Sequence, residues 1–386
     1  MNHVNRRNFI KLSASAGALA LVPTGVQAKE TTVNKKKLPE RILGKRTGIK
    51  LPVLSMGVMR ADNQSVVRAS YNSGIVMFDT ANGYQNGKNE EMLGEFFADK
   101  PRESYIMATK VKENISDNAA TKFLEKFETS MKRLRMPYVD ILYLHAVDKV
   151  DHVTYAPIIE VMLKLKKDGR AKNLGVSTHS NEPAVINAAV DNGNYDVVLT
   201  SYNYTQKHLD ELNPAIDKAA KAGLGVVAMK TMAGGYLDKE RTQKVNTRAA
   251  LKWALQNPNI HTAIPGFTSF DQLEEALESA MNLKLNKDEK QYLSAANNSL
   301  YCNGCRGCET QCPNHLPIPE MMRAYMYNYG YKNPALAKEV IDELALADNV
   351  CDNCTSCTVK CIAGFQVAQK VKDIIRLPHI PQDFLV

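Results

Sequence analysis

The chain has 386 residues, with 49 Lys and Arg against 41 Asp and Glu, and its formal net charge is +8. Arg6, Arg7 and Lys11 carry three of these charges, so the chain after residue 28 has only +5. A balance this small excludes a strongly basic protein and gives no reason to expect a nucleic-acid partner. No segment after residue 28 approaches membrane-spanning length, so we expect no membrane span in the mature chain.

Residues 1–28 have the pattern of an export signal. The adjacent Arg6 and Arg7 precede a weakly apolar run from Leu12 to Val22 and a small-residue cleavage site that ends at Ala28. The run is too short and too rich in Ser, Ala and Gly to be a good membrane span. The segment resembles a twin-arginine signal, which implies export to the periplasm; a general secretory signal or an amphipathic leader is the alternative. A linker at 29–40 would follow.

Residues 41–290 alternate short apolar, β-branched runs with amphipathic stretches. The predicted strands are Leu51–Met59, Ile75–Ala81, Tyr105–Val111, Val139–Ala146, Asn173–His179, Asp196–Asn203, Leu224–Met232 and His261–Phe267. The predicted helices include Glu90–Ala98, Thr121–Leu134, Ile158–Lys167, Pro183–Asp191, Leu209–Ala222, Thr247–Gln256 and Asp271–Met281. Eight strand–helix repeats predict an α/β fold of the (β/α)8 TIM barrel type. A doubly wound sheet also alternates, but no G-x-G-x-x-G opens the first unit.

Four polar residues fall at or just after the ends of successive predicted strands: Asp79, Tyr84, Lys110 and His145. Strand ends of a barrel meet at one rim, so we expect these side chains to lie together and to move a proton to or from a carbonyl oxygen. A lysine held by an aspartate beside Tyr84 would favour the phenolate and lower the pKa of the tyrosine, and His145 would orient the substrate. Taken singly, each residue has a structural alternative as a cap, an ion-pair partner or a core residue.

The motifs around these residues resemble those of the aldo-keto reductases. The matching stretches are "DTANGYQNGKNEEMLG", "ATKV", "LHAVD", "GVSTHS" and "IPGFTSFDQLEEAL", and the likeness spans Arg41 to Asn282. The resemblance implies a (β/α)8 oxidoreductase that transfers hydride between a nicotinamide and a small carbonyl or alcohol. It also implies that Tyr84 is the general acid/base, that Asp79 and Lys110 tune it, and that His145 orients the substrate.

The same resemblance implies which residues would contact the nicotinamide, and at some of these positions this chain differs from the family. Gly266 and Gln272 stand where members that prefer the phosphorylated cofactor have Lys and Arg, which speaks against the extra phosphate. Met229 aligns with the tyrosine that stacks on the nicotinamide, and Leu199 with the glutamine that holds its carboxamide. Ser177 matches the carboxamide-binding serine.

A second candidate cofactor contact is the helix start after "PGFTS". Free backbone N–H groups at Thr268 and Ser269 could bind a pyrophosphate or a 2′-hydroxyl, because helix N-termini attract anions. We therefore expect a nicotinamide cofactor, NAD(P). We do not expect the additional phosphate of NADP to be needed for its binding.

All eight cysteines lie near the end of the chain, in two runs that both read C-x2-C-x2-C-x3-C. This spacing is typical of [4Fe–4S] clusters, and in two-cluster proteins the fourth cysteine of each run binds the other cluster. We therefore predict two [4Fe–4S] clusters. One would be held by Cys302, Cys305, Cys308 and Cys361, and the other by Cys351, Cys354, Cys357 and Cys312.

Zinc and disulfides are the alternatives for these cysteines. Structural zinc uses paired C-x2-C knuckles, which would leave the third and fourth cysteine of each run without a role. Disulfides between cysteines two or three residues apart would strain the bridge. The second run departs from the usual pattern, because Ile362 and not proline follows Cys361. Proline is not a cluster ligand, so this difference removes no ligand.

Residues 291–386 are predicted to form a small α-helical ferredoxin-like domain, with helices at Pro319–Tyr329 and Pro334–Ala345 between the runs. The combination resembles a subgroup of aldo-keto reductases that carry such a domain and are often exported. Two one-electron carriers could split a hydride equivalent and pass electrons to or from a redox partner protein. The alternatives are an electron-transfer subunit whose barrel is a scaffold, and a conventional reductase whose clusters only stabilise the tail.

Overall fold

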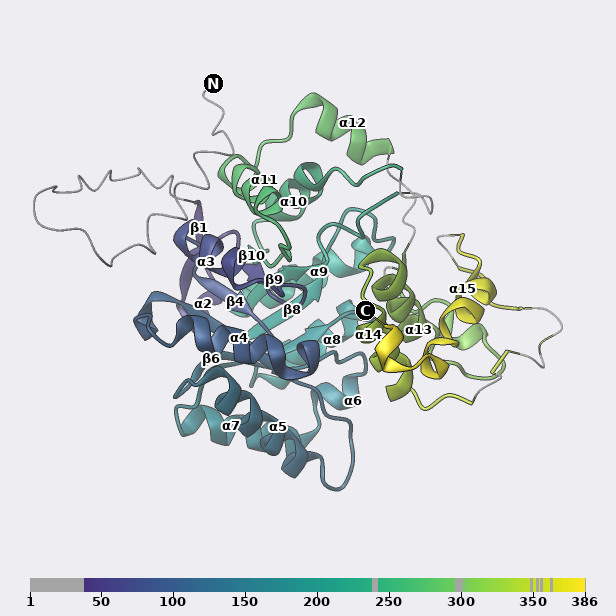
Figure 1. The fold of residues 1–386 in the computed structure, drawn as a ribbon, viewed down its shortest axis with the longest axis horizontal. Coiled ribbons are helices and arrows are strands. Elements are labelled where there is room, and N and C mark those ends of the chain that lie inside the picture. Colours follow the sequence, from purple (N-terminus) through teal and green to yellow (C-terminus); the bar gives the residue numbers. More distant parts are fainter. Residues whose placement is uncertain are drawn as a thin grey trace, which may run out of the picture.

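The computed structural model describes residues 38–237, 242–295, 301–302, 304–347, 350–351, 354, 357–361 and 364–385. The predicted export signal at 1–28 and most of the linker at 29–40 lie outside these residues. Figure 1 shows a barrel of strands and helices, coloured purple to green, and a smaller helical part in olive and yellow that packs beside it.

Eight parallel strands form the barrel, and each pairs with the next in chain order. They are β3 (Met56–Gly57), β4 (Met77–Asp79), β5 (Ile106–Val111), β6 (Val139–Leu144), β7 (Ala171–Thr178), β8 (Val197–Ser201), β9 (Gly225–Met229) and β10 (Thr262–Ala263). Parallel bridges from Leu54 to Ala263 and from Gly57 to Gly266 join the first strand to the last. The sheet therefore closes on itself, and the prediction of a (β/α)8 TIM barrel is confirmed.

The first predicted strand, Leu51–Met59, is divided in the structure. Leu51 belongs to β2 (Lys50–Pro52), which pairs antiparallel with β1 (Glu40–Ile42), and only Met56–Gly57 joins the barrel. A side chain on Gly57 would place its Cβ 2.6 Å from the carbonyl oxygen of Ile264. The barrel thus closes through a close backbone approach that leaves no room for a side chain at this position.

The helices of the barrel part lie outside the strands, and all seven predicted helices are present. The helices are α2 (Gly44–Thr47), α3 (Gln64–Asn72), α4 (Lys88–Phe97), α5 (Ala119–Leu134), α6 (Val150–Val153), α7 (Ala156–Lys167), α8 (Glu182–Asn192), α9 (Leu209–Lys221), α10 (Thr247–Gln256), α11 (Phe270–Met281) and α12 (Lys287–Ala295). Helix α5 buries Phe123, Phe127, Met131 and Leu134, an i, i+4, i+8 and i+11 pattern that faces the sheet. Helix α12 crosses the expected domain boundary at residue 290 and is tied to α10 by the ion pair of Lys252 and Glu289.

Apolar side chains fill the interior of the barrel. Residues from six of the eight strands or their ends, among them Met77, Ala108, Tyr143, Leu199 and Val227, form one buried cluster inside it. A second and larger cluster lies between the strands and the surrounding helices. The interior is a packed core, so space for a ligand remains at the carboxyl ends of the strands.

The part after residue 300 is helical. It consists of the short turn η3 (Glu309–Gln311), α13 (Ile318–Tyr325) with a π-helical extension η4 (Met326–Gly330), α14 (Pro334–Glu343), α15 (Val367–Ile374), η5 (Leu377–His379) and η6 (Gln382–Phe384). The two predicted helices are confirmed, and Asn333 caps α14 by accepting a hydrogen bond from the N–H of Leu336 (3.0 Å). A separate apolar core holds these helices together.

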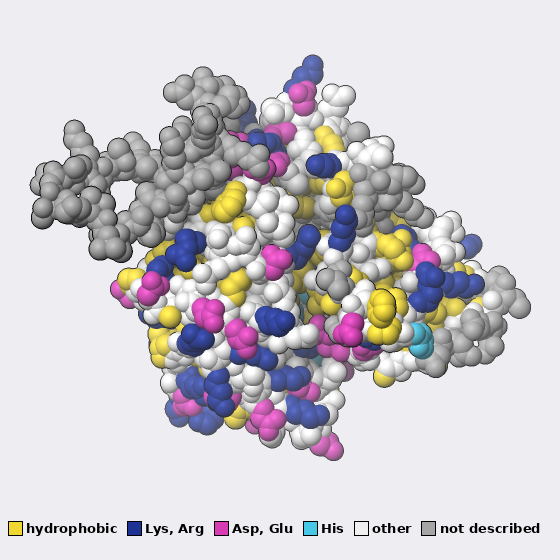
Figure 2. All heavy atoms as spheres, viewed as in Figure 1, with side chains coloured by type: hydrophobic (Ala, Val, Ile, Leu, Met, Phe, Trp, Pro, Cys, Tyr) yellow, Lys and Arg dark blue, Asp and Glu magenta, His cyan; other side chains and the backbone are white. Residues whose placement is uncertain are grey.

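None of the helices among the described residues is long and apolar enough to cross a membrane. On the face shown in Figure 2, Lys and Arg side chains lie interspersed with Asp and Glu side chains.

Candidate active site

The four predicted catalytic residues meet at one rim of the barrel. Asp79 ends β4, Tyr84 begins the 3-10 turn η1 (Tyr84–Gly87), Lys110 lies in β5, and His145 follows β6. Lys110 forms a buried ion pair with Asp79, and its Nζ donates to the carbonyl oxygen of Thr80 (2.7 Å) and lies 3.4 Å from the Tyr84 hydroxyl oxygen. The rings of Tyr84 and His145 stand edge to face with their centroids 5.9 Å apart.

The electrostatics of Tyr84 differ from the sequence-based expectation. Burial raises the pKa of Tyr84, and the carboxylates of Asp79 and Glu339 raise it further, with opposition from Arg323. The pKa of Tyr84 is therefore raised and not lowered as predicted, because burial of its hydroxyl is the largest cause and the charge of Asp79 adds to it. Tyr84 is thus a neutral hydroxyl that can donate a proton.

His145 is also neutral near pH 7. Burial lowers its pKa well below the usual value for histidine, and the positive charge of Lys110 adds to that effect. A neutral imidazole can donate one hydrogen bond to a substrate oxygen without carrying a charge into the site. Tyr84 and His145 together can therefore bind a carbonyl oxygen.

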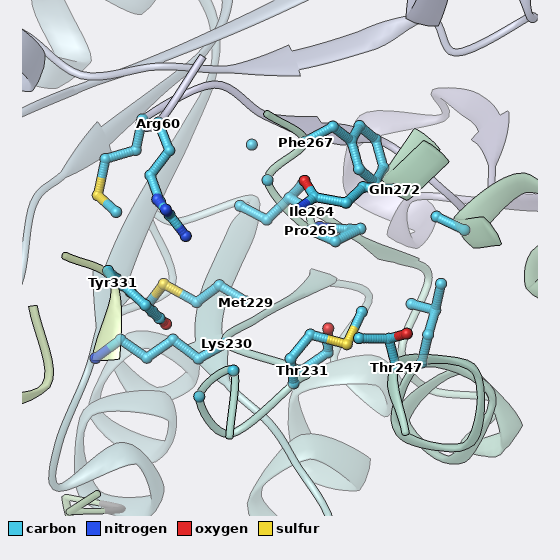
Figure 3. A pocket seen from close by; sticks show the side chains of 18 of the residues that line it. Arg60, Met229, Lys230, Thr231, Thr247, Ile264, Pro265, Phe267, Gln272 and Tyr331 are labelled. Carbon is cyan, nitrogen blue, oxygen red and sulfur yellow. The ribbon is translucent and has the colours of Figure 1, made fainter. Parts of the chain in front are cut away.

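A cavity of about 260 Å³ runs from Asp79 and Tyr84 toward the start of α11. Figure 3 shows its lining, with Met229 and Lys230 on one side and Ile264, Pro265 and Phe267 on the other. Of the predicted cofactor contacts, Met229 and Gly266 line this cavity, as does Gln272. Its length and mostly apolar lining are typical of a small-molecule or cofactor site.

The other predicted cofactor contacts are engaged elsewhere. The N–H of Thr268 donates to the side-chain oxygen of Gln272 (2.8 Å), so it is not free as expected. The hydroxyl of Ser269 caps α11 by accepting from the N–H of Gln272 (3.4 Å). Ser177 is fully buried, and its hydroxyl accepts from the N–H of Ala146 (2.9 Å). Leu199 lies in the apolar interior of the barrel.

The segment after residue 300 covers the mouth of the barrel, which the sequence did not predict. Tyr327 and Tyr331 line the cavity together with Arg60 and Lys230. The Lys230 ammonium lies 5.6 Å from the centroid of the Tyr327 ring, and the Arg60 guanidinium lies 5.6 Å from that of Tyr331. The only hint in the sequence is the tyrosine-rich stretch "YMYNYGY", whose partners are more than ninety residues away.

Lys230 and His179 also line the site. Burial lowers the pKa of Lys230 to about 7, and the nearby Arg323 guanidinium contributes. His179 lines the large cavity, and burial lowers its pKa well below the usual value. A smaller adjoining cavity is lined by His179, Lys230, Ser201 and Cys302. The first cysteine of the tail therefore lies at the edge of the catalytic cavity.

The eight thiols form no disulfides, and they divide into two groups in space. Burial is the main cause of the raised pKa of Cys302, and the thiols next to it that raise this pKa further are those of Cys305, Cys308 and Cys361. Burial likewise raises the pKa of Cys351. The thiols that act on Cys351 are those of Cys354, Cys312 and Cys357. Each group thus has three cysteines of one run and the last cysteine of the other.

Hydrogen bonds connect the two runs. Thr358 donates to the carbonyl oxygen of Gln311 (2.8 Å), and the N–H of Lys360 donates to the side chain of Gln311 (2.7 Å). Among the described residues, no set of three or more His, Cys, Asp or Glu side chains converges on a point that would suit a single metal ion. Two sets of four thiols suit the donor requirement of [4Fe–4S] clusters, in which the thiolates bind different iron atoms.

The barrel is similar to known oxidoreductases. The model of the aldo/keto reductase family matches residues 53–249. The chain is 27% identical to L-galactose dehydrogenase of Arabidopsis thaliana over 293 residues, which cover 64% of this chain and 90% of that protein. It is 26% identical to methylglyoxal reductase DkgB of Escherichia coli O157:H7 over 271 residues, which cover 66% of this chain and 94% of that protein.

A solved structure shows the same fold. The aldo-keto reductase AKR11C1 from Bacillus halodurans, in its holo form, aligns with a TM-score of 0.57 and 22% identity, over 68% of this chain and 97% of that one. The family match covers just over half of the chain and includes Asp79, Tyr84, Lys110 and His145. The chain therefore belongs to the aldo/keto reductase family and is an oxidoreductase enzyme.

Proposed function

We propose that this enzyme reduces a small carbonyl compound, or oxidises the corresponding alcohol, and exchanges the electrons through two [4Fe–4S] clusters held by its eight cysteines. The observation that carries the proposal is the position of Cys302. It lines a small cavity with His179 and Lys230, and both of these residues also line the large cavity that contains Asp79 and Tyr84. The proposed cluster ligand and the proposed proton donor thus lie on the same rim.

Tyr84 and His145 perform the proton chemistry in this proposal. The substrate oxygen accepts hydrogen bonds from the Tyr84 hydroxyl and from the neutral His145 ring. The carbon needs two electrons and a proton, which a bound nicotinamide would supply as hydride, while the Tyr84 hydroxyl gives its proton to the oxygen; in the reverse direction the phenolate takes that proton back. Lys110 then stabilises the phenolate, because its Nζ lies 3.4 Å from the hydroxyl oxygen.

The proposed cluster ligands follow the two groups of thiols. Cys302, Cys305, Cys308 and Cys361 would hold the cluster next to the barrel, and Cys351, Cys354, Cys357 and Cys312 would hold the other. When bound, such clusters supply or accept electrons one at a time. Cys354 and Cys357 are exposed, which is where a redox partner protein would make contact.

A nicotinamide remains part of the proposal. The large cavity reaches from Tyr84 to α11, and the backbone of Gly266 and the side chain of Met229 line it. When bound, a nicotinamide supplies a hydride. Gly266 and Gln272 offer no cation for an additional phosphate, so we propose NAD rather than NADP. Identification of the nucleotide that copurifies under anaerobic conditions tests this point.

We also propose that residues 1–28 direct export to the periplasm by the twin-arginine route, as a protein that has already folded around its clusters. A folded route suits an iron–sulfur protein because its thiols remain reduced until the clusters are in place. Replacement of both Arg6 and Arg7 by Lys should leave the enzyme in the cytoplasm. Secretion of the double variant as before would contradict the proposal.

The central experiment starts from the anaerobically purified holoprotein with its clusters reduced by dithionite. Addition of candidate carbonyl compounds should reoxidise the clusters, and Tyr84→Phe should slow this reaction by about 10²- to 10⁴-fold. Clusters that no carbonyl compound reoxidises would contradict a relay. Reoxidation by a partner protein at an unchanged rate in Tyr84→Phe, with no carbonyl turnover, would indicate the electron-transfer alternative.

A further inference from the structure

Arg306 stands in the middle of the first cysteine run, between Cys305 and Cys308, and its side chain reaches the barrel. Its Nη1 donates to the carboxylate of Asp148 (2.8 Å) and to the hydroxyl oxygen of Ser180 (3.2 Å). The side chain of Arg306 is 11% exposed and that of Asp148 is 25% exposed, so the pair is shielded from water, unlike surface ion pairs that contribute little. The first cysteine run is therefore fixed to the barrel by a side chain of its own.

The same guanidinium also binds two acids of the tail. Its Nε donates to Glu309 (2.7 Å), and its Nη1 donates to Glu320 (2.9 Å). Glu320 belongs to α13, which continues into η4, and Tyr327 of η4 lines the large cavity. Arg306 thus links three parts of the molecule, namely the barrel, the first cysteine run and the helix whose extension covers the catalytic cavity.

The barrel residues that Arg306 binds belong to loops that carry the histidines of the site. Asp148 comes three residues after His145, and Ser180 directly follows His179. The centroids of the two imidazole rings lie 6.2 Å apart, and His179 lines both cavities. The contact of Arg306 with the barrel is therefore made at the edge of the catalytic site and not on a remote face.

Backbone contacts beside Arg306 bring the cysteine run and the barrel together. The N–H of Asn181 donates to the carbonyl oxygen of Gly304 (3.2 Å), and a Cβ on Gly304 would lie only 2.5 Å from the carbonyl oxygen of His179. The N–H of Gly304 in turn donates to the sulfur of Cys302 (3.3 Å). Because the N–H of Asn181 is bonded across this contact, its exchange with solvent reports whether the run is docked.

We propose that Arg306 is a positioning residue that, through Asp148, holds the first cysteine run at the distance from the catalytic cavity that electron exchange requires. The inference rests on the proposed function, because it concerns the route of the electrons between the cavity and the clusters. Oxidation of one hydride equivalent in the cavity releases a proton and two electrons, and each cluster accepts one electron. Electron transfer slows steeply as the separation of two centres grows, so loss of the contact should slow this step.

The test uses the anaerobically purified holoprotein and the variants Arg306→Gln and Asp148→Asn. Reoxidation of dithionite-reduced clusters by a carbonyl compound should slow by about tenfold in each variant. The double variant should be no slower than the slower single variant, because both changes remove the same contact. Reduction of the same compound by added NADH passes hydride within the cavity, and its rate should stay within about twofold of the wild type.

Reduction potentials separate the position of the run from the charge of its partners. Arg306→Gln removes a positive charge near the cluster and should lower its potential, whereas Asp148→Asn removes a negative charge and should raise it. Both variants should nevertheless slow reoxidation. Arg306→Lys keeps the charge but cannot bind Asp148, Glu309 and Glu320 together, so its potential should stay near that of the wild type while its reoxidation is slower. Redox titration followed by electron paramagnetic resonance measures the potentials.

Glu309→Gln is the matched control. Like Asp148→Asn it removes a carboxylate bound by Arg306, but one that lies in the tail, so the contact with the barrel remains. Its reoxidation rate should stay within about twofold of the wild type. Hydrogen exchange at the N–H of Asn181 should become about tenfold faster in Arg306→Gln and Asp148→Asn and should not change in Glu309→Gln. Visible absorption checks that each variant retains its clusters.

Three results would overturn the inference. Unchanged reoxidation in Arg306→Gln and Asp148→Asn would reject it and leave the proposed function intact, as would rates that rise and fall with the potentials. Equal losses of reoxidation and of reduction by NADH would give Arg306 a general structural role. Clusters that no carbonyl compound reoxidises in the wild type would reject the proposed function, and the role of Arg306 in electron exchange with it.

Discussion

Lys230, at the end of strand β9, and Cys302, the first cysteine of the tail, line the same small cavity beside the catalytic one. The two residues are 72 positions apart in sequence. Their proximity joins the part of the chain that has the proton chemistry to the part that has the proposed clusters.

The buried ion pair of Asp79 and Lys110 should show a strong penalty when only one partner is removed. Both side chains are 2% exposed, so Lys110→Met or Asp79→Asn leaves a buried charge unpaired and should cost about 3–5 kcal/mol in the free energy of unfolding. The double variant should cost less than the sum of the two. Urea unfolding followed by the fluorescence of the single tryptophan, Trp253, measures the effect.

The exposed pair of Lys164 and Asp168 is the control for this experiment. Their side chains are 74% and 42% exposed, and Lys164→Met should cost less than about 1 kcal/mol. Equal costs for the exposed and the buried pair would contradict the prediction.

His208 should make stability depend on pH. Burial lowers its pKa, but the hydrogen bond to Glu182 (3.0 Å) and the charge of that carboxylate outweigh burial, so the pKa of His208 is raised. Asp210 and Glu211 add to the rise. The folded state therefore holds the proton more tightly than the unfolded state, whose pKa is about 6.5.

The contribution of His208 should be complete below about pH 6.5 and should be lost as the pH rises through the pKa of the folded state. Unfolding free energies of the wild type and His208→Gln, measured between pH 5.5 and 8.5, should differ most at the acidic end. A difference that grows toward alkaline pH would refute the assignment.

Gly304 should be required for the tail to pack on the barrel. Its φ is +76°, and a Cβ at this position would lie 2.5 Å from the carbonyl oxygen of His179. Gly304→Ala should loosen this contact, at a cost of about 1–3 kcal/mol, and make the tail more sensitive to limited proteolysis. Gly307→Ala is the control, because a Cβ there would meet only the sulfur of Cys305 at 3.9 Å.

The crossed grouping of the cysteines predicts which substitutions act on the same cluster. Cys361→Ser should disturb the same paramagnetic signal as Cys302→Ser, although Cys361 belongs to the second run, because its thiol lies near that of Cys302. Cys312→Ser should instead disturb the same signal as Cys351→Ser. Iron analysis and electron paramagnetic resonance of the reduced protein measure this. If Cys361→Ser disturbed the same signal as Cys351→Ser, the crossed arrangement would be contradicted.

The sequence by itself determined the elements and the rim of the barrel. Strand and helix positions were predictable because their apolar periodicities are local, and β5 begins within one residue of its predicted start and ends at its predicted end. Asp79, Tyr84, Lys110 and His145 could be placed together because all parallel strands end at the same rim. The cysteine runs were visible because ligand spacing is also a local pattern.

Only the tertiary structure decided how the site is enclosed. Tyr327 and Tyr331 line the cavity that contains Tyr84, although 243 and 247 positions of chain separate them from it, and no local pattern records such a contact. The direction of the pKa shift of Tyr84 was mispredicted for the same reason, since it depends on burial and on the charges of Asp79 and Glu339. Likewise, Thr268 looked free at a helix start until the fold placed the side chain of Gln272 on its N–H. Spacing along the chain identifies the groups, but burial and charge pairing set their chemistry.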